Sequence, residues 1–170
     1  LHEDGSFLEG TAYFSYSISN IMPILVMYAT ARDRELEKVI PRKVRQLGNF
    51  ADVLISTDRR GGLIPMSSGQ GEGRHTDLAT IQFLSVMAPD SQWVRIYRER
   101  MKQRNDQPIA NLTFWRLVRQ APEEIPPMPA IAELPKMGLM AYTRFIGDEP
   151  VKILLLGGPP NYHGHQHRDR

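Results

Sequence analysis

The stretch Ala121-Pro122-Glu123-Glu124-Ile125-Pro126-Pro127-Met128-Pro129-Ala130-Ile131-Ala132-Glu133-Leu134-Pro135 divides the sequence into two parts of different character. Its prolines lack a backbone donor and fix φ, so the stretch predicts an extended linker rather than a helix. Before it, apolar residues recur at three- and four-residue steps, which is typical of helices. After it, residues 138–145 and 151–156 have the composition of two strands around a turn at 147–150. We therefore predict a mainly α fold that ends in a β part.

Five helices are predicted before the linker, at residues 9–30, 33–54, 76–87, 91–103 and 109–119. The apolar stripe of the first is predicted from the helical spacing of Tyr13, Tyr16, Ile21, Ile24 and Leu25. The apolar stripe of the second predicted helix consists of Leu36, Val39, Ile40, Val44, Leu47, Phe50 and Leu54. Pro23 and Pro41 lie inside these two segments, and each is expected to kink or divide its helix.

The domain organisation follows from the same change in composition. We expect a helical part at residues 1–120, a proline-rich linker at 121–137 and the start of a β domain at 138–170. Two strands alone do not make a stable sheet, so the sequence is expected to be a fragment of a longer chain. The pattern gives no indication of an oligomeric state.

Composition excludes several classes of function. The chain has 170 residues, 41% of them hydrophobic and 24% charged, which is ordinary for a soluble globular protein. A net charge of +2, with the basic residues spread along the chain, argues against nucleic acid as a partner. The absence of cysteine excludes disulfides and thiolate metal sites. The longest mostly apolar run, residues 18–31, is too short to cross a bilayer, so no membrane span is predicted.

Three alternating histidines near the end of the sequence are the first candidate site. His163, His165 and His167 share one face if the segment is extended, because side chains two apart point the same way. Imidazoles grouped in this way can bind a metal and exchange protons near neutral pH. Asp169 can orient one of them as a hydrogen-bond acceptor. The alternative is a solvated tail or a purification tag, although tags usually carry uninterrupted histidines.

A glycine- and serine-rich loop at residues 56–73 is the second candidate. Long ordered loops are often functional, whereas flexible linkers have a similar composition. Arg59, Arg60 and Arg74 flank the glycines and could pair with the carboxylates or sulfates of an acidic polysaccharide. A solvated run of charge is the alternative interpretation of these arginines.

Two motifs, taken in order, resemble the heparinase II/III-like polysaccharide lyases, a group that includes oligo-alginate lyases. The first is Asp4-Gly5-Ser6-Phe7-Leu8-Glu9-Gly10-Thr11-Ala12-Tyr13-Phe14-Ser15-Tyr16, similar to the family's Asp-Gly…Glu-Gly-x-x-Tyr-x-x-Tyr segment. The second is Leu154-Leu155-Leu156-Gly157-Gly158-Pro159 followed by His163-Gly164-His165-Gln166-His167-Arg168-Asp169, which resembles the segment where the family's β-sandwich begins. The resemblance covers nearly the whole chain. It implies an incomplete α/α toroid followed by the first strands of an antiparallel β-sandwich.

The resemblance also implies an activity, namely cleavage of uronic-acid-containing glycans by β-elimination. Tyr13 would be the catalytic tyrosine with Tyr16 in reserve, and His165 the catalytic histidine with His163 in reserve. His167 would bind a structural zinc ion, with Asp169 as an outer partner. The substrate would be an acidic polysaccharide or oligosaccharide, and the protein would be periplasmic or secreted by a bacterium. The family's carboxylate-neutralising Asn or His has no match here, so the fragment alone is expected to be inactive.

The chemistry of β-elimination agrees with these residue types. A base removes the weakly acidic C5 proton while the C4 oxygen leaves, and the developing charge must be stabilised. A tyrosine can do both proton transfers, but its ordinary pKa is about 10, so it needs a neighbour such as histidine. Without the resemblance, core packing is the simpler interpretation of Tyr13 and Tyr16. The alternative function is a non-catalytic module of the same architecture that binds acidic glycans; a third is a helical scaffold whose histidines bind metal adventitiously.

Overall fold

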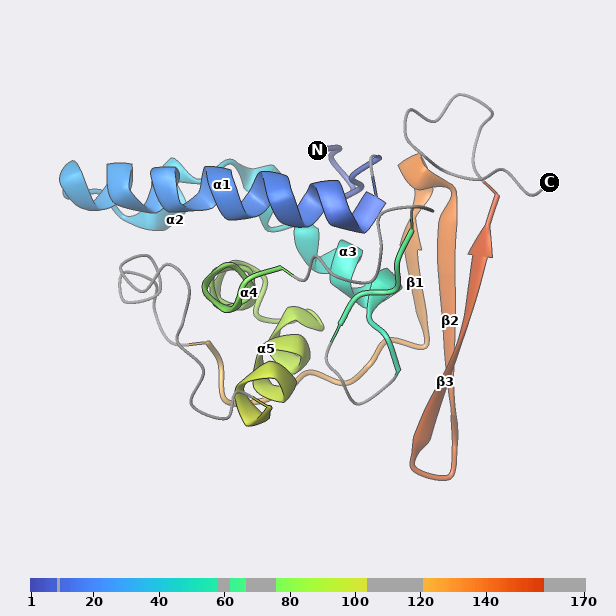
Figure 1. Ribbon diagram of the computed structural model, residues 1–170. Helices are drawn as coiled ribbons and strands as arrows, with labels where there is room; N and C mark the ends of the chain where they lie inside the picture. Colours follow the sequence, from blue (N-terminus) through green and yellow to red (C-terminus); the bar gives the residue numbers. More distant parts are fainter. Residues whose placement is uncertain (9, 58–61, 67–75, 104–120, 158–170) are drawn as a thin grey trace.

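The structure is a computed structural model of residues 1–170, and it describes all of them except 9, 58–61, 67–75, 104–120 and 158–170 (Figure 1). The described residues form five α-helices and a three-stranded antiparallel sheet. The fold is therefore mixed α and β, rather than mainly α as predicted. Helices do precede the strands along the chain, as the sequence indicated.

The first helix, α1 (Gly10–Ala31), continues through Pro23 without being divided. The prediction of which side of α1 is buried was wrong. The core receives Phe14, Ile18, Met22 and Val26, whereas the exposed residues include Tyr13, Tyr16, Ile21 and Ile24. The helix is apolar on more than one side, so its spacing fits two stripes equally well and only its neighbours decide between them.

The second predicted helix is divided at Pro41, as expected. Its pieces are α2 (Leu36–Val39), the short 3-10 helix η1 (Arg42–Val44) and α3 (Leu47–Leu54). Ile40 has extended backbone angles, which is the usual consequence of a proline at the next position. Five members of the predicted stripe, from Ile40 to Leu54, are buried.

The next two predicted helices are confirmed as α4 (Leu78–Met87) and α5 (Trp93–Lys102). Asp77 caps α4, because its Oδ1 accepts a hydrogen bond from the Thr80 N–H at 3.0 Å. The predicted helix at 109–119 lies outside the described residues. Figure 1 shows α1 lying across α4 and α5, with α3 between these helices and the sheet.

The core joins the helices through stacked aromatic rings. The Phe14 ring of α1 stacks on Phe50 of α3, with centroids 4.4 Å apart, and on Trp93 of α5, with centroids 5.7 Å apart. The indole Nε1 of Trp93 donates a hydrogen bond to the Leu47 carbonyl at 2.8 Å. All three rings are fully buried. One cluster therefore fixes α1, α3 and α5 relative to one another.

The sheet has the order β1 (Ile131–Leu134), β2 (Leu139–Ile146) and β3 (Glu149–Leu156), with antiparallel neighbours. The strands β2 and β3 confirm the two predicted strands. Strand β1 was not predicted as a strand, because it lies in the proline-rich stretch expected to be a linker. Its backbone is extended as expected, but it pairs with β2 from Ile131 opposite Tyr142 to Leu134 opposite Leu139.

Gly5 supports the first testable prediction, which concerns the loop before α1. Its φ is +86°, and a Cβ added there would overlap the backbone carbonyl of Gln46. Gly5→Ala is therefore expected to lower the free energy of unfolding by more than about 1 kcal/mol. Chemical denaturation measures the change. Gly147→Ala is the control, since it shares a positive φ but has open space around it, and an equal loss in both variants would contradict the predicted overlap.

Candidate functional site

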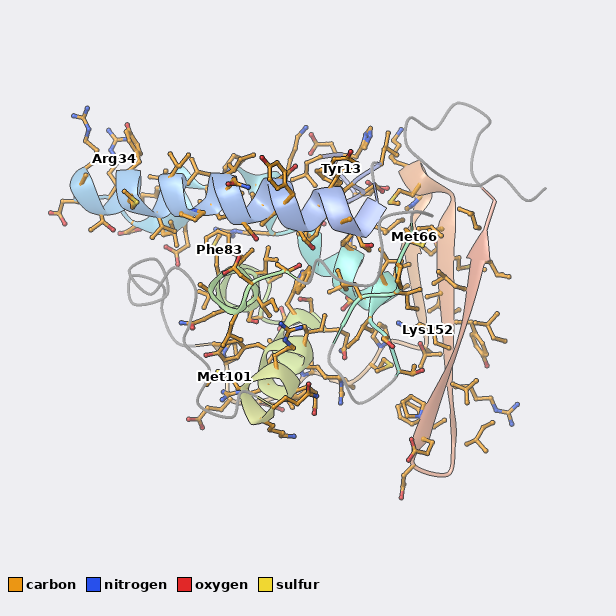
Figure 2. The ribbon with its side chains drawn as sticks, viewed as in Figure 1. Tyr13, Arg34, Met66, Phe83, Met101 and Lys152 are labelled. Atoms are coloured by element: carbon orange, nitrogen blue, oxygen red, sulfur yellow. The ribbon has the colours of Figure 1, made fainter. Side chains whose placement is uncertain are left out.

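The two predicted tyrosines lie on the outer side of α1 rather than in the core. The side chain of Tyr13 is 37% exposed and that of Tyr16 is 59% exposed. Figure 2 labels Tyr13 near the start of α1, on the side away from α4 and α5. Core packing therefore does not explain either residue. The remaining predicted site residues lie outside the described part of the chain: His163, His165, His167, Asp169, Arg59, Arg60 and Arg74.

The loop before α1 is tied to the sheet. The Asp4 carboxylate accepts hydrogen bonds from the backbone N–H of Lys136 at 2.8 Å and of Ser6 at 3.0 Å. Burial raises the pKa of Asp4, but these hydrogen bonds stabilise the carboxylate and leave its pKa below the ordinary value. Lys136 belongs to η2 (Pro135–Met137), the short 3-10 helix that joins β1 to β2. The start of the Asp-Gly motif is therefore anchored at one end of the sheet.

The chain leaves the sheet at that same end. The Gly157 N–H, just after β3, donates a hydrogen bond of 2.8 Å to the carbonyl of Gly138, which follows η2. Figure 1 shows the end of β3, the N-terminus and the start of α1 on the same side of the molecule. The two motifs that carry the family resemblance are far apart in sequence. Their described portions nevertheless meet at one connection, between β1 and β2.

A separate cleft of about 540 Å³ opens between α2, α3 and the turn after α4. Its size falls in the range of ligand sites in proteins. Neither Tyr13 nor Tyr16 lines it. The lining residues are Glu37, Arg45, Gly48, Asn49, Asp52, Val86, Met87, Ala88, Pro89, Asp90 and Ser91.

Asp52 is the chemically distinctive residue of this cleft. Its Oδ1 accepts a hydrogen bond of 2.8 Å from the Gln92 N–H, which precedes α5. Burial raises the pKa of Asp52 to about 6, although the Gln92 hydrogen bond and the charge of Lys152 act to lower it. A carboxyl group of this kind exchanges its proton near neutral pH, which is what a general acid or base requires.

Lys152 of β3 reaches the same place from the sheet. Its Nζ donates to the backbone carbonyls of Asp52 at 2.9 Å and Val53 at 3.3 Å, in the last turn of α3. Burial lowers the pKa of Lys152 to about 8, against the opposing effect of the Asp52 carboxylate. A cation at a helix C-terminus interacts favourably with the helix dipole. Figure 2 shows Lys152 between the sheet and the helices, so this pair holds the sheet against α3.

Neither residue was predicted from the sequence, although each has a signal there. Asp52 follows Phe50 and Ala51 and precedes Val53 and Leu54 in an otherwise apolar segment. Lys152 interrupts an apolar strand in the same way. A single charge inside a buried element requires a partner, so such positions are candidates for ionic pairing or for a site.

The pKa of Asp52 gives the second prediction. Because this pKa is higher in the folded chain (about 6) than its ordinary value of 3.8, folding binds a proton over that interval. The stabilising contribution of Asp52 is present below about pH 4 and is lost as the pH rises through 6. Asp52→Asn keeps an oxygen for the Gln92 N–H and removes the titration. The difference in unfolding free energy between parent and variant should fall by on the order of 2 kcal/mol between pH 4 and 7. Parallel pH profiles would contradict this assignment.

The described residues include neither a metal-binding group nor a helix that could span a membrane. Among the described residues, no group of three or more His, Asp or Glu side chains is placed to hold a metal ion. In the same part of the chain, no helix has the length and hydropathy needed to span a bilayer. The histidines predicted to bind metal lie outside that part.

Comparison with protein-family models, with curated proteins and with solved structures finds no match to this chain. The resemblance to the heparinase II/III-like lyases therefore rests on the two motifs themselves.

Proposed function

We propose that the protein is a polysaccharide lyase that cleaves uronic-acid-containing glycans by β-elimination. One observation carries the proposal: the loop that begins the Asp-Gly motif and the point where the chain leaves β3 meet at the β1–β2 connection, through Asp4, Lys136, Gly138 and Gly157. Gly157, the last described residue before the histidine segment, therefore lies at the end of the sheet that also holds the approach to Tyr13. An active site that combines the two motifs requires such proximity.

The exposure of Tyr13 also supports the proposal. A tyrosine that transfers protons to and from a polymer must present its hydroxyl at the surface, and Tyr13 does so from the first turn of α1. Tyr16 lies one turn further along the same helix and is the reserve candidate. In the proposed reaction the tyrosine protonates the departing C4 oxygen. For one substrate stereochemistry the tyrosine starts as the phenolate, which His165 would favour, takes the C5 proton and delivers that same proton to the C4 oxygen as the C4–O bond breaks.

The test of this function is an assay with the native full-length protein on alginate-, chondroitin- and heparin-like chains. Elimination produces an unsaturated uronate, whose conjugated double bond absorbs ultraviolet light, whereas hydrolysis produces no such absorbance. Appearance of that absorbance with at least one substrate supports the proposal. Retention of acidic glycans on the protein without any unsaturated product would favour the non-catalytic glycan-binding module instead.

The zinc prediction concerns His167. The segment after Gly157 offers imidazole and carboxylate donors without thiolate, a set that suits zinc. The ion would anchor the segment structurally, while His165 stays available for proton transfer. His167→Ala in the full-length protein should lower the zinc content per chain and the melting temperature, as measured by elemental analysis and thermal unfolding. His2→Ala is the control, and unchanged zinc stoichiometry in the His167 variant would refute the assignment.

A further inference from the structure

The cleft between α2, α3 and the turn after α4 has a polar wall that belongs to α3 and the turn before it. The residues of this wall lie at steps of three, four and seven from the first, so they share one helical face: Arg45, Gly48, Asn49 and Asp52. A Cβ added at Gly48 would lie 2.9 Å from the Cβ of Ser91, so glycine lets α3 approach the turn after α4 closely. This approach places Asp52, one turn further along α3, at the side of the cleft.

The opposite wall of the cleft is apolar. It consists of the end of α4 and the residues that follow it, namely Val86, Met87, Ala88 and Pro89. Met87 and Ala88 are buried and hold this wall in place. Small-molecule sites usually combine an apolar lining with a few polar groups that fix the orientation of the ligand. The cleft, with a volume of about 540 Å³, has both parts.

Negative charge predominates around the cleft. Among the described lining residues, Glu37 on α2, Asp52 on α3 and Asp90 after α4 are carboxylates, against the single guanidinium of Arg45. Lys152 approaches Asp52 from β3, but its Nζ donates to backbone carbonyls in the last turn of α3. The C-terminal end of α4, which carries partial negative charge, also borders the cleft. The cleft therefore favours a positively charged ligand over a negatively charged one.

The carboxylate of Asp52 can accept more hydrogen bonds than it receives. Its Oδ1 accepts one from the Gln92 N–H at 2.8 Å, and within the described residues it forms no salt bridge. An ionised carboxylate has about four acceptor positions. Burial raises the pKa of Asp52 to about 6, so its charge is incompletely compensated in the free protein. A cation bound beside it would supply that compensation.

We propose that this cleft binds a small organic cation, in which a protonated amine is attached to an apolar body. The ammonium group donates hydrogen bonds to the Asp52 carboxylate, and the body lies against the apolar wall. The ligand is organic rather than a metal ion, because a metal ion needs donor atoms on several sides and one wall of the cleft offers only hydrocarbon groups. The proposal is independent of the proposed lyase activity, since neither Tyr13 nor Tyr16 lines the cleft.

Calorimetric titration of the full chain with benzylamine, at about pH 7 where the amine is protonated, tests the proposal. Benzylammonium should bind with a Kd of about 1 mM or tighter, which is ordinary for a ligand of this size. Benzyl alcohol has nearly the same shape without the charge and should bind at least about tenfold more weakly, and benzoate should bind no better than the alcohol. In nitrogen-15 NMR spectra, benzylammonium should shift the amide signals of Gly48, Asn49 and residues 86–91.

Two variants assign the effect to Asp52. Asp52→Asn keeps an acceptor for the Gln92 N–H, so it should weaken benzylammonium binding at least about tenfold and leave benzyl alcohol binding unchanged. Glu35→Gln is the matched control, since it removes an exposed charge that pairs with Lys38 and does not line the cleft, and it should bind like the parent. Because the pKa of Asp52 is about 6, the affinity of the parent should fall about tenfold from about pH 7 to about pH 5, whereas that of Asp52→Asn should not.

The comparison of amine and alcohol uses the parent alone, so it decides the proposal even if Asp52→Asn does not fold. Benzylammonium that binds no more tightly than benzyl alcohol would overturn the proposal. Amide shifts confined to residues outside the cleft would also overturn it, because the amine then binds elsewhere. An equal loss of affinity in Asp52→Asn and Glu35→Gln would reduce the effect to general surface charge and would be a third contradiction.

Discussion

Tyr13→Phe is expected to abolish most of the proposed lyase activity of the full-length protein while leaving its fold intact. The phenylalanine keeps the ring and its packing, and it lacks only the hydroxyl of a side chain that is 37% exposed. Removal of a positioned general acid or base typically lowers the rate by a hundred- to ten-thousand-fold. The loss should fall on kcat rather than on KM alone, because the proposed role of the hydroxyl is in the transition state. Initial rates of unsaturated uronate formation measure it.

Two matched variants on the same helix make this result specific. Tyr28→Phe removes a hydroxyl from a tyrosine that is 47% exposed and lies four turns further along α1, so it should keep the parent rate. Tyr16→Phe separates the two candidates of the motif. If Tyr13→Phe cleaves polyuronides at the parent rate while Tyr16→Phe does not, the catalytic assignment moves to Tyr16. If all three variants keep the parent rate, α1 carries no catalytic tyrosine.

Much of the local structure could be predicted from sequence because strong signals act over short distances. Pro41 ended a helix because it cannot continue the hydrogen-bond ladder, and Gly147 with Asp148 marked the turn between β2 and β3. The strand β1 was missed because its flanking prolines dominate the local pattern. Only pairing with β2 shows that Ile131–Leu134 is part of a sheet. Pairing between distant segments leaves little trace in the local sequence.

The larger error of the sequence-based prediction concerned which side of α1 is buried. That side decides whether Tyr13 and Tyr16 lie in the core or at the surface. The notion that Tyr13 and Tyr16 belong to the apolar stripe came from spacing alone, but Phe14 occupies the core instead. One position of rotation along the helix moves a side chain by about 100°, so a shift of one residue exchanges a core role for a surface role. Asp52 and Lys152 were missed because burial, which shifts both pKa values, depends on the packing of β3 against α3.

Trp93→Ala is expected to be strongly destabilising, lowering the free energy of unfolding by about 3–5 kcal/mol. The indole is fully buried, and its removal leaves a cavity between α1, α3 and α5. It also leaves the Leu47 carbonyl without the donor that Trp93 supplies at 2.8 Å. The midpoint and slope of chemical denaturation, extrapolated to water, measure the change. Tyr28→Ala is the control, because that exposed ring should account for less than about 1 kcal/mol.

Trp93→Phe separates the two parts of this effect. The phenyl ring keeps part of the stack on Phe14 but cannot donate to Leu47, so the carbonyl at the start of α3 loses its hydrogen bond from the indole. Loss of one buried hydrogen bond costs about 0.5–1.5 kcal/mol, so the phenylalanine variant should lie between the parent and Trp93→Ala. If Trp93→Phe is as unstable as Trp93→Ala, the hydrogen bond to α3 dominates over packing. If Trp93→Ala itself is no less stable than Tyr28→Ala, the aromatic cluster does not hold α1, α3 and α5 together, and the placement of Tyr13 relative to the sheet loses its physical basis.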